Sequence, residues 1–69
     1  MKYRIRLDDA CTVFSLYNDG ELTYVRNWVG DLLLEIAKDH SIDVSASPSE
    51  SYMLSTLQNH GLDIDVEDI

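Results

Sequence analysis

The sequence has few of the residues that cross-link small proteins through disulfides or bind metals. Its 69 residues include one cysteine, Cys11, and two histidines, His40 and His60. A single cysteine excludes a disulfide within the chain, and the spacings typical of zinc ligands do not occur. The sequence also has no glycine-rich phosphate loop and no catalytic motif. We therefore expect no catalytic residue, no metal site and no cofactor.

Long apolar runs are missing as well. The longest aliphatic run is residues 32–34, whereas a membrane-spanning helix needs about 20 apolar residues. Residues 2–6 alternate charged and apolar side chains and so lack the apolar segment of a signal peptide. Because a lone thiol suits a reducing compartment, we expect a soluble, cytoplasmic protein. The length and a hydrophobic content of 45% predict one folded domain over residues 1–69.

Basic residues are scarce and unevenly distributed. The chain has 5 Lys and Arg against 13 Asp and Glu, which gives a formal net charge of −8. Lys2, Arg4 and Arg6 are three of the five bases, and residues 39–69 contain no Lys or Arg. A charge of this sign repels nucleic acid and anionic membranes and attracts basic surfaces. We therefore expect a basic protein partner, with no direct binding of nucleic acid or membrane.

Alternating patterns predict strands at both ends of the chain. Residues 2–7 alternate strictly, which is typical of a half-buried strand. Residues 12–17 are rich in β-branched and aromatic side chains and predict a second strand, in a hairpin with the first. Residues 41–46 read as a short extended stretch. Residues 62–67 alternate apolar and acidic side chains and predict the final strand.

The middle of the chain leaves one assignment open. Asn18-Asp19-Gly20 is a turn signal, and Asp-Gly between apolar runs is typical of a hairpin, which makes residues 21–25 a third strand. However, apolar residues recur at spacings of three and four from Leu22 to Ala37, so we favour a helix over residues 21–39. Gly30 would cost this helix about 1 kcal/mol relative to alanine.

A second helix is predicted by the segment Ser47-Pro48-Ser49-Glu50. Ser47 can cap the helix, Pro48 suits its first position and Glu50 completes a capping box, so we expect a helix to about residue 59. The order of elements predicts an α+β domain. Its small antiparallel-type sheet would combine an N-terminal hairpin with the C-terminal strand, and both helices would pack on one face.

Acidic residues form two regular rows in these predicted elements. On the first helix, three carboxylates at i, i+4 and i+8 form a stripe, although like charges at that spacing cost roughly 0.2–0.5 kcal/mol per pair. On the last strand, residues two apart lie roughly 6.5–7 Å apart on one face, which resembles the spacing of backbone phosphates. The candidate partner-binding residues are Asp31, Glu35, Asp39, Asp43, Asp63, Asp65, Glu67 and Asp68.

Two structural alternatives remain open for these surfaces. If the last strand pairs with the first, Lys2, Arg4 and Arg6 face its acids, and each cross-strand pair is worth roughly 0.2–1 kcal/mol. The acids of the strand would then be structural. Apolar residues off the helical stripe, namely Leu34, Tyr24 and Tyr52, offer a contact patch or the seam of a weak homodimer. Trp28, which lies on the stripe, could also contribute affinity to such a contact.

A small, compact, strongly acidic chain of this kind resembles phage and mobile-element inhibitors of host defence, including DNA-mimicking anti-CRISPR and anti-restriction proteins. The run Tyr17-Asn18-Asp19-Gly20, followed by Leu22 and Trp28, is similar to the strand, Tyr-Asn-x-Gly, Leu and Trp pattern of the ArdA anti-restriction family. Trp28 comes two residues later than in that pattern.

The resemblance implies a non-enzymatic inhibitor whose carboxylates occupy a nucleic-acid-binding groove of a host defence complex. Its partner would be a basic nucleic-acid-binding protein or complex. The alternative is an interaction module, such as an antitoxin, immunity protein or adaptor, that binds through an exposed apolar patch.

Overall fold

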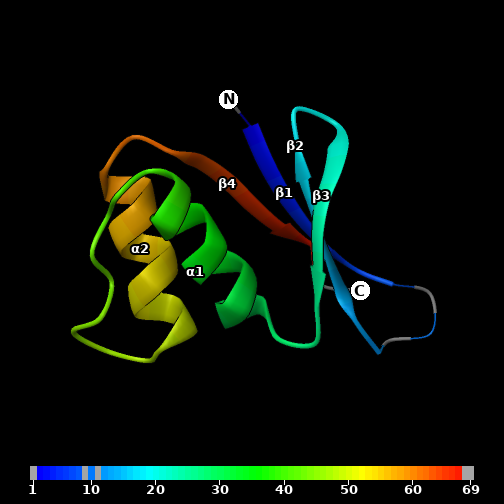
Figure 1. Cartoon of the computed structure of the whole chain (residues 1–69), viewed down its shortest axis with the longest axis horizontal. Coiled ribbons are helices and arrows are strands. Elements are labelled where there is room, and N and C mark those ends of the chain that lie inside the picture. Colours follow the sequence, from blue (N-terminus) through cyan, green and yellow to red (C-terminus); the bar gives the residue numbers. More distant parts are fainter. Residues whose placement is uncertain (1, 9, 11, 68–69) are drawn as a thin grey trace.

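The computed structural model describes residues 2–8, 10 and 12–67, and these form four strands and two helices (Figure 1). The elements are β1 (Lys2–Leu7), β2 (Phe14–Asn18), β3 (Glu21–Arg26), α1 (Val29–Asp39), α2 (Glu50–Asn59) and β4 (Asp63–Glu67). The strands form one sheet in the order β3-β2-β1-β4, and both helices lie on the same side of it. The predicted α+β class is therefore confirmed.

The sheet is mixed, with two antiparallel pairings and one parallel pairing. β2 runs antiparallel to β1 and to β3, whereas β4 runs parallel to β1 with Lys2 opposite Asp63 and Arg6 opposite Glu67. β4 is parallel because the chain reaches it from α2 in the helical layer and not through a hairpin turn. The predicted N-terminal hairpin is confirmed, and the last strand pairs with the first, an alternative that the sequence had left open.

The predicted helix over residues 21–39 is wrong in its first third, which is strand β3. Asp19 and Gly20 form the two-residue turn into β3 with φ angles of +52° and +87°. Two successive positive φ angles are the geometry of a type I′ hairpin, which reverses the chain onto β2. Leu22 and Val25 fit the helical spacing, but their side chains remain 52% and 41% exposed.

The hydrophobic core lies between the sheet and the helices. β1 alternates buried and exposed residues, and α1 buries one side along its whole length. Burying each large apolar side chain contributes about 1.5–3 kcal/mol. The fully buried large side chains are Ile5, Leu16, Leu32, Leu33, Ile36, Met53 and Leu57.

Polar turns shift several boundaries from their predicted positions. β2 begins at residue 14 because Thr12 and Val13 belong to a turn, in which the Asp8 carboxylate accepts their backbone N–H groups at 2.7 and 3.2 Å. Residues 41–46 form no strand. There the Asp43 carboxylate accepts the backbone N–H and the hydroxyl of Ser45 at 2.9 and 2.6 Å.

The start of α2 also differs from the predicted capping box. Ser49, not Ser47, is the N-cap, and its hydroxyl accepts the Tyr52 N–H at 3.4 Å. The Ser47 hydroxyl instead accepts the Ser49 N–H at 3.3 Å. The helix therefore begins at Glu50, two residues later than the sequence pattern indicated.

Candidate protein-binding surfaces

Charged residues of two neighbouring strands share the open face of the sheet, meaning the face turned away from the helices. The parallel register places Lys2 opposite Asp63, Arg4 opposite Asp65, and Arg6 opposite Glu67. Tyr3 and Ile5, which alternate with the bases, are buried in the core, so the bases project from the opposite face. These six charges cancel formally.

Two arginines hold the last acid of this face. The Nε atom of Arg6 lies 2.9 Å from one Glu67 carboxylate oxygen, and the Nε atom of Arg4 lies 3.4 Å from the other. The three side chains are between 36% and 54% exposed, so each pair is worth no more than about 1 kcal/mol. The structural alternative is therefore confirmed for Glu67, whereas Asp63 and Asp65 lie opposite Lys2 and Arg4 in the register and, among the described residues, form no ion pair within 4.0 Å.

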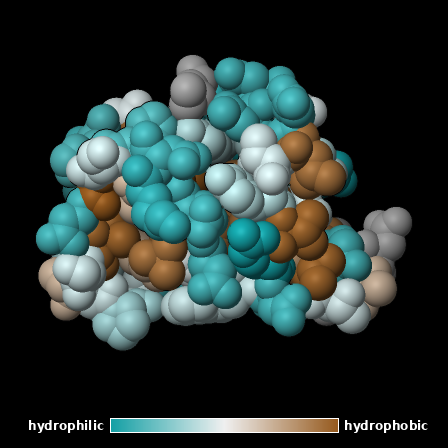
Figure 2. All heavy atoms as spheres, viewed as in Figure 1, coloured by the Kyte–Doolittle hydropathy of each residue, from teal (hydrophilic) through white to brown (hydrophobic). Residues whose placement is uncertain are grey.

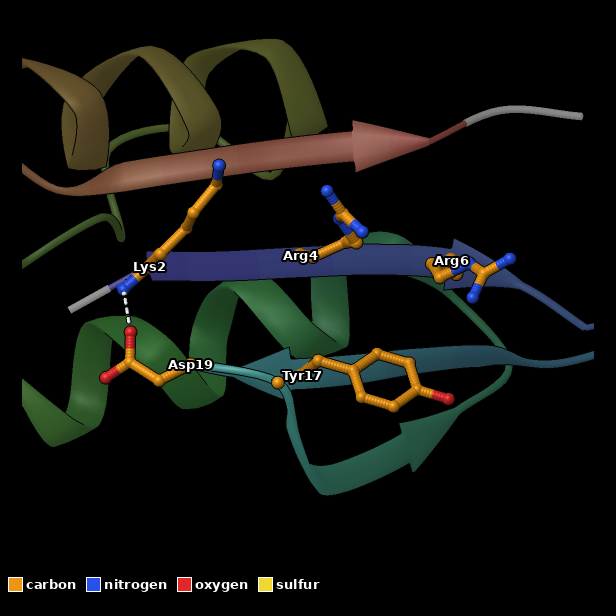
Figure 3. A pocket seen from close by; sticks show the side chains of 6 residues that line it. Lys2, Arg4, Arg6, Tyr17 and Asp19 are labelled. Atoms are coloured by element: carbon orange, nitrogen blue, oxygen red, sulfur yellow. Dashed lines mark hydrogen bonds between the residues drawn. The ribbon is translucent and has the colours of Figure 1, made fainter.

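The bases of β1 also border a shallow hollow of about 440 Å³ (Figure 3). Lys2, Arg4 and Arg6 follow one another along β1, and Tyr17 lies beside them on β2. Asp19 closes one end, where its carboxylate accepts the backbone N–H of Lys2 at 2.7 Å. The lining of the hollow combines three cations with an aromatic ring, but two of these cations, Arg4 and Arg6, already form ion pairs with Glu67.

The acids of α1 form a second surface, which we call the α1 acidic row: Asp31, Glu35 and Asp39. All three lie in one regular helix, so the row spans about 12 Å along its axis. Asp31 and Asp39 are exposed, and Glu35 is half-buried with its carboxylate 4.0 Å from the Lys38 ammonium. The predicted stripe of three carboxylates on the first helix is present.

The helix dipole gives the members of this row different structural roles. Asp31 lies in the first turn of α1, where a negative charge is favourable. Asp39 is the last residue of the helix, where a negative charge is unfavourable. Local helix stability therefore accounts for Asp31 but not for Asp39.

The remaining candidate acids belong to neither row. Asp43 is bound to Ser45 in the loop after α1, and these hydrogen bonds, first from the Ser45 hydroxyl and then from its N–H, lower the pKa of Asp43. Asp68 lies outside the described residues. The structure thus divides the candidate acids between the helical side and the open face of the sheet, and does not gather them into one surface.

The net charge is shared equally between the helical segment and the rest of the chain, but the bases are not. Residues 29–60, which comprise both helices and the loop between them, contain five acids and one lysine, a formal charge of −4. Residues 1–28 and 61–69 carry the other −4, with eight acids and four bases. The helical side therefore has a single base, whereas three of the other four bases lie on β1 opposite the acids of β4.

A hydrophobic groove lies on this same helical side. It has a volume of about 260 Å³ and is lined by Trp28, Leu34, Val44, Ser45, Ser47, Pro48 and Met53. Figure 2 shows apolar residues gathered over the helices and, separately, over β3. Leu34 and Trp28 were among the residues expected to form an apolar contact, whereas the contribution of the 44–48 loop was not expected.

Gly30 is the sequence signal that could have indicated this groove, although no groove was predicted from it. A methyl group added at Gly30 would lie 2.5 Å from two carbons of the Trp28 indole. The glycine therefore lets the indole lie across the first turn of α1, and this close approach explains a glycine inside a helix. Trp28 remains 40% exposed in that position.

One polar contact links the start of β1 to the end of α1. The Tyr3 hydroxyl and the His40 Nε2 atom are 2.8 Å apart. Burial, with smaller effects from the charges of Asp39 and Asp19, raises the pKa of Tyr3, so the phenol keeps its proton. Within the described ranges, no group of three His, Cys, Asp or Glu side chains is arranged to hold a metal ion.

Comparison of the chain with protein-family models, curated proteins and solved structures finds no match. Neither described helix is long and apolar enough to cross a membrane.

Proposed function

We propose that this chain is a non-enzymatic inhibitor that presents its acidic helical side to the nucleic-acid-binding groove of a basic protein or complex. The observation that supports this most directly is the scarcity of bases on the helical side. Each base of β1 lies opposite an acid of β4, whereas residues 29–60 have five acids and a single lysine. The α1 acidic row supplies the regularly spaced carboxylates.

The proposed mechanism is DNA binding with the charges exchanged. Lysines and arginines that normally contact phosphates would contact Asp31, Glu35 and Asp39. Complementary charge accelerates association and makes it sensitive to salt. The protein would thereby compete with DNA for the same groove, as expected of an anti-CRISPR or anti-restriction inhibitor in the bacterial cytoplasm.

A displacement experiment tests this proposal. Proteins of a bacterial lysate are retained on duplex-DNA cellulose and then eluted with the purified chain at low salt. We expect the wild-type chain to release a set of basic proteins, and the release to fall steeply between about 50 and about 200 mM salt. The variant Asp31→Asn/Glu35→Gln/Asp39→Asn should be at least about tenfold less effective.

A variant with the same loss of charge provides the control. Glu21→Gln/Asp63→Asn/Asp65→Asn also removes three negative charges, but from the sheet, and should elute nearly as much protein as the wild type. Equal loss in both variants would mean that net charge alone matters. Release that ignores salt, or no release, would contradict the proposal.

An apolar contact module is the second candidate, and exposed side chains favour it. Among the described residues, five large hydrophobic ones remain at least 36% exposed, namely Leu22, Val25, Trp28, Leu34 and Tyr52. An antitoxin, immunity protein or adaptor would use such residues for affinity and the acids for solubility. In that case Leu34→Ala should weaken partner binding more than removal of the α1 acidic row.

A further inference from the structure

We propose that the hydrophobic groove beside α1 binds a single apolar side chain of a basic peptide segment. The groove is formed where the start of α1 meets the loop that leads into α2. The proposal rests on the proposed function in one respect, because both assume a basic partner. It adds a site for an apolar anchor, which charge mimicry alone does not require.

The size of the groove favours one side chain. Its volume is about 260 Å³, which is below the range of about 300–1,000 Å³ typical of small-molecule pockets. Met53 is only 1% exposed and forms part of the lining, so an occupant would contact the core of the domain. The apolar walls offer contact area rather than polar recognition.

The exposed wall is made of residues suited to protein contact. Trp28 and Leu34 are 40% and 38% exposed, so both would be buried further by an occupant. Tryptophan is enriched among the residues that dominate binding energy at interfaces. Gly30 allows this wall to form, because the Trp28 indole occupies the space that a side chain at position 30 would fill.

Charge near the groove determines the chemistry of the occupant. Three acids are one residue or one helical turn away from a residue of the lining: Asp31, Asp43 and Glu50. Lys38 is the one base in residues 29–60, and its ammonium lies 4.0 Å from Glu35. Arg26, which precedes this region, lies 5.3 Å from the centroid of the Tyr24 ring. A segment with Lys or Arg beside its apolar anchor therefore complements the groove.

The same charge argues against a second copy as the occupant. Two helical sides that each carry a formal charge of −4 would repel one another across the groove. A weak homodimer through this side is therefore disfavoured, and a heterologous basic segment is the better match.

Selection from a phage-displayed library of random linear peptides tests the proposal and does not require the natural partner to be identified. We expect the selected peptides to have more Lys and Arg than the unselected library and to share one bulky apolar residue. A synthetic, tryptophan-free peptide of this kind should change the fluorescence of Trp28, the one tryptophan of the chain. Alanine in place of its apolar residue should weaken binding about tenfold.

Variants of the groove locate the site. Leu34→Ala and Leu34→Glu should both weaken binding of the selected peptide by about tenfold or more. Leu22→Ala is the matched control, because Leu22 is equally apolar and 52% exposed on the opposite side of the sheet. It should change binding less than about twofold. Far-UV circular dichroism of each variant confirms that the fold is retained.

Several results would overturn the proposal. The first is a selected peptide that binds wild type and Leu34→Glu equally. The second is a selection that yields no binding peptide, or peptides without an excess of Lys and Arg. The third is sedimentation of the chain as a dimer that Leu34→Glu dissociates. The peptide assay contains no DNA, so its failure is distinct from failure of the displacement experiment. Peptide binding without displacement would support the groove and reject mimicry of DNA.

Discussion

The open face of the sheet and the helical side use charge in opposite ways. On the open face, Arg4 and Arg6 both contact Glu67, and the register places each base of β1 opposite an acid of β4. On the helical side, residues 29–60 have five acids and a single lysine. Regular spacing of acids in the sequence therefore does not show whether they form a free negative surface, because this depends on whether bases lie beside them in the fold.

The two sides also differ in what their exposed apolar residues adjoin. Leu22 and Val25 lie on the open face opposite Tyr17 and Ser15, on an exposed strand surface. Trp28 and Leu34 line a groove that reaches a buried core residue. Exposed apolar area on the helical side is therefore concave, which suits the capture of a side chain, whereas that on β3 lies along a strand.

The largest expected effect on stability is the difference between two separate variants, one that replaces a buried leucine with alanine and one that replaces an exposed leucine. Leu16 is 1% exposed and faces the core, and Leu22 lies on the adjacent strand with its side chain on the open face. Leu16→Ala should lower the free energy of unfolding by about 2–5 kcal/mol. Leu22→Ala should lower it by about 0.5 kcal/mol or less. Urea unfolding followed by circular dichroism measures both, and similar losses would contradict the assignment of faces.

A matched pair of charge reversals should change stability in opposite directions. Glu67→Lys places a third cation between Arg4 and Arg6 and should cost about 1 kcal/mol. Glu35→Lys relieves the repulsion within the α1 acidic row and should stabilise the protein by about 0.5 kcal/mol. Thermal unfolding at low salt measures both shifts. A destabilised Glu35→Lys variant would show that Glu35 has a structural role.

Gly30→Ala sharpens the comparison on the helical side alone. Alanine raises helix propensity by about 1 kcal/mol, but its methyl group displaces the Trp28 indole. We expect a small net change in the free energy of unfolding together with a changed Trp28 emission maximum and greater quenching by acrylamide. Ala37→Gly, elsewhere in α1, is a control that should lower stability and leave the emission nearly unchanged. An unchanged spectrum in Gly30→Ala would contradict the position of the indole.

The smallest expected effect is a pH dependence of stability, to which the turns held by Asp8 and by Asp43 both contribute. Backbone N–H groups of Thr12 and Val13 lower the pKa of Asp8, and Ser45 lowers the pKa of Asp43, both from an ordinary value of 3.8. A lowered pKa in the folded state stabilises the protein above the pKa of the unfolded chain, and this contribution is lost as the pH falls through the folded value.

Asp8→Asn and Asp43→Asn should therefore be less stable than the wild type at pH 7. We expect the difference to shrink as the pH falls below 3.8. Urea midpoints measured at a series of pH values test this. A difference that persists unchanged in acid would show that the two carboxylates do not act through their charge.

Much of the fold was predictable because local patterns and tertiary packing agree. The alternation in residues 2–7 predicted β1, and the apolar spacing after Trp28 predicted the buried side of α1. The pattern failed over residues 21–26, where the same spacing fits a helix but the Asp19-Gly20 turn directs the chain into a strand. Spacing alone does not distinguish a residue in the core from one on an exposed strand face.

The candidate site was predictable only in part. Asp31, Glu35 and Asp39 share one helix, so their alignment follows from the sequence and the helical repeat. The fate of Asp63, Asp65 and Glu67 depended on which strand lies beside β4, a contact between residues about 60 positions apart in the chain. The groove likewise joins α1 to a loop whose course no local pattern defines.

The sequence by itself determined the excess of negative charge, the strands at both ends, the helices after Trp28 and Pro48 and the acidic row of α1, because these depend on composition and on neighbours within a few residues. The tertiary structure alone decided that β4 lies parallel to β1, that Glu67 is held by Arg4 and Arg6, and that a hydrophobic groove opens on the acidic side. These features depend on long-range packing of the sheet against the helices, which lowers the free energy only when the whole chain has folded.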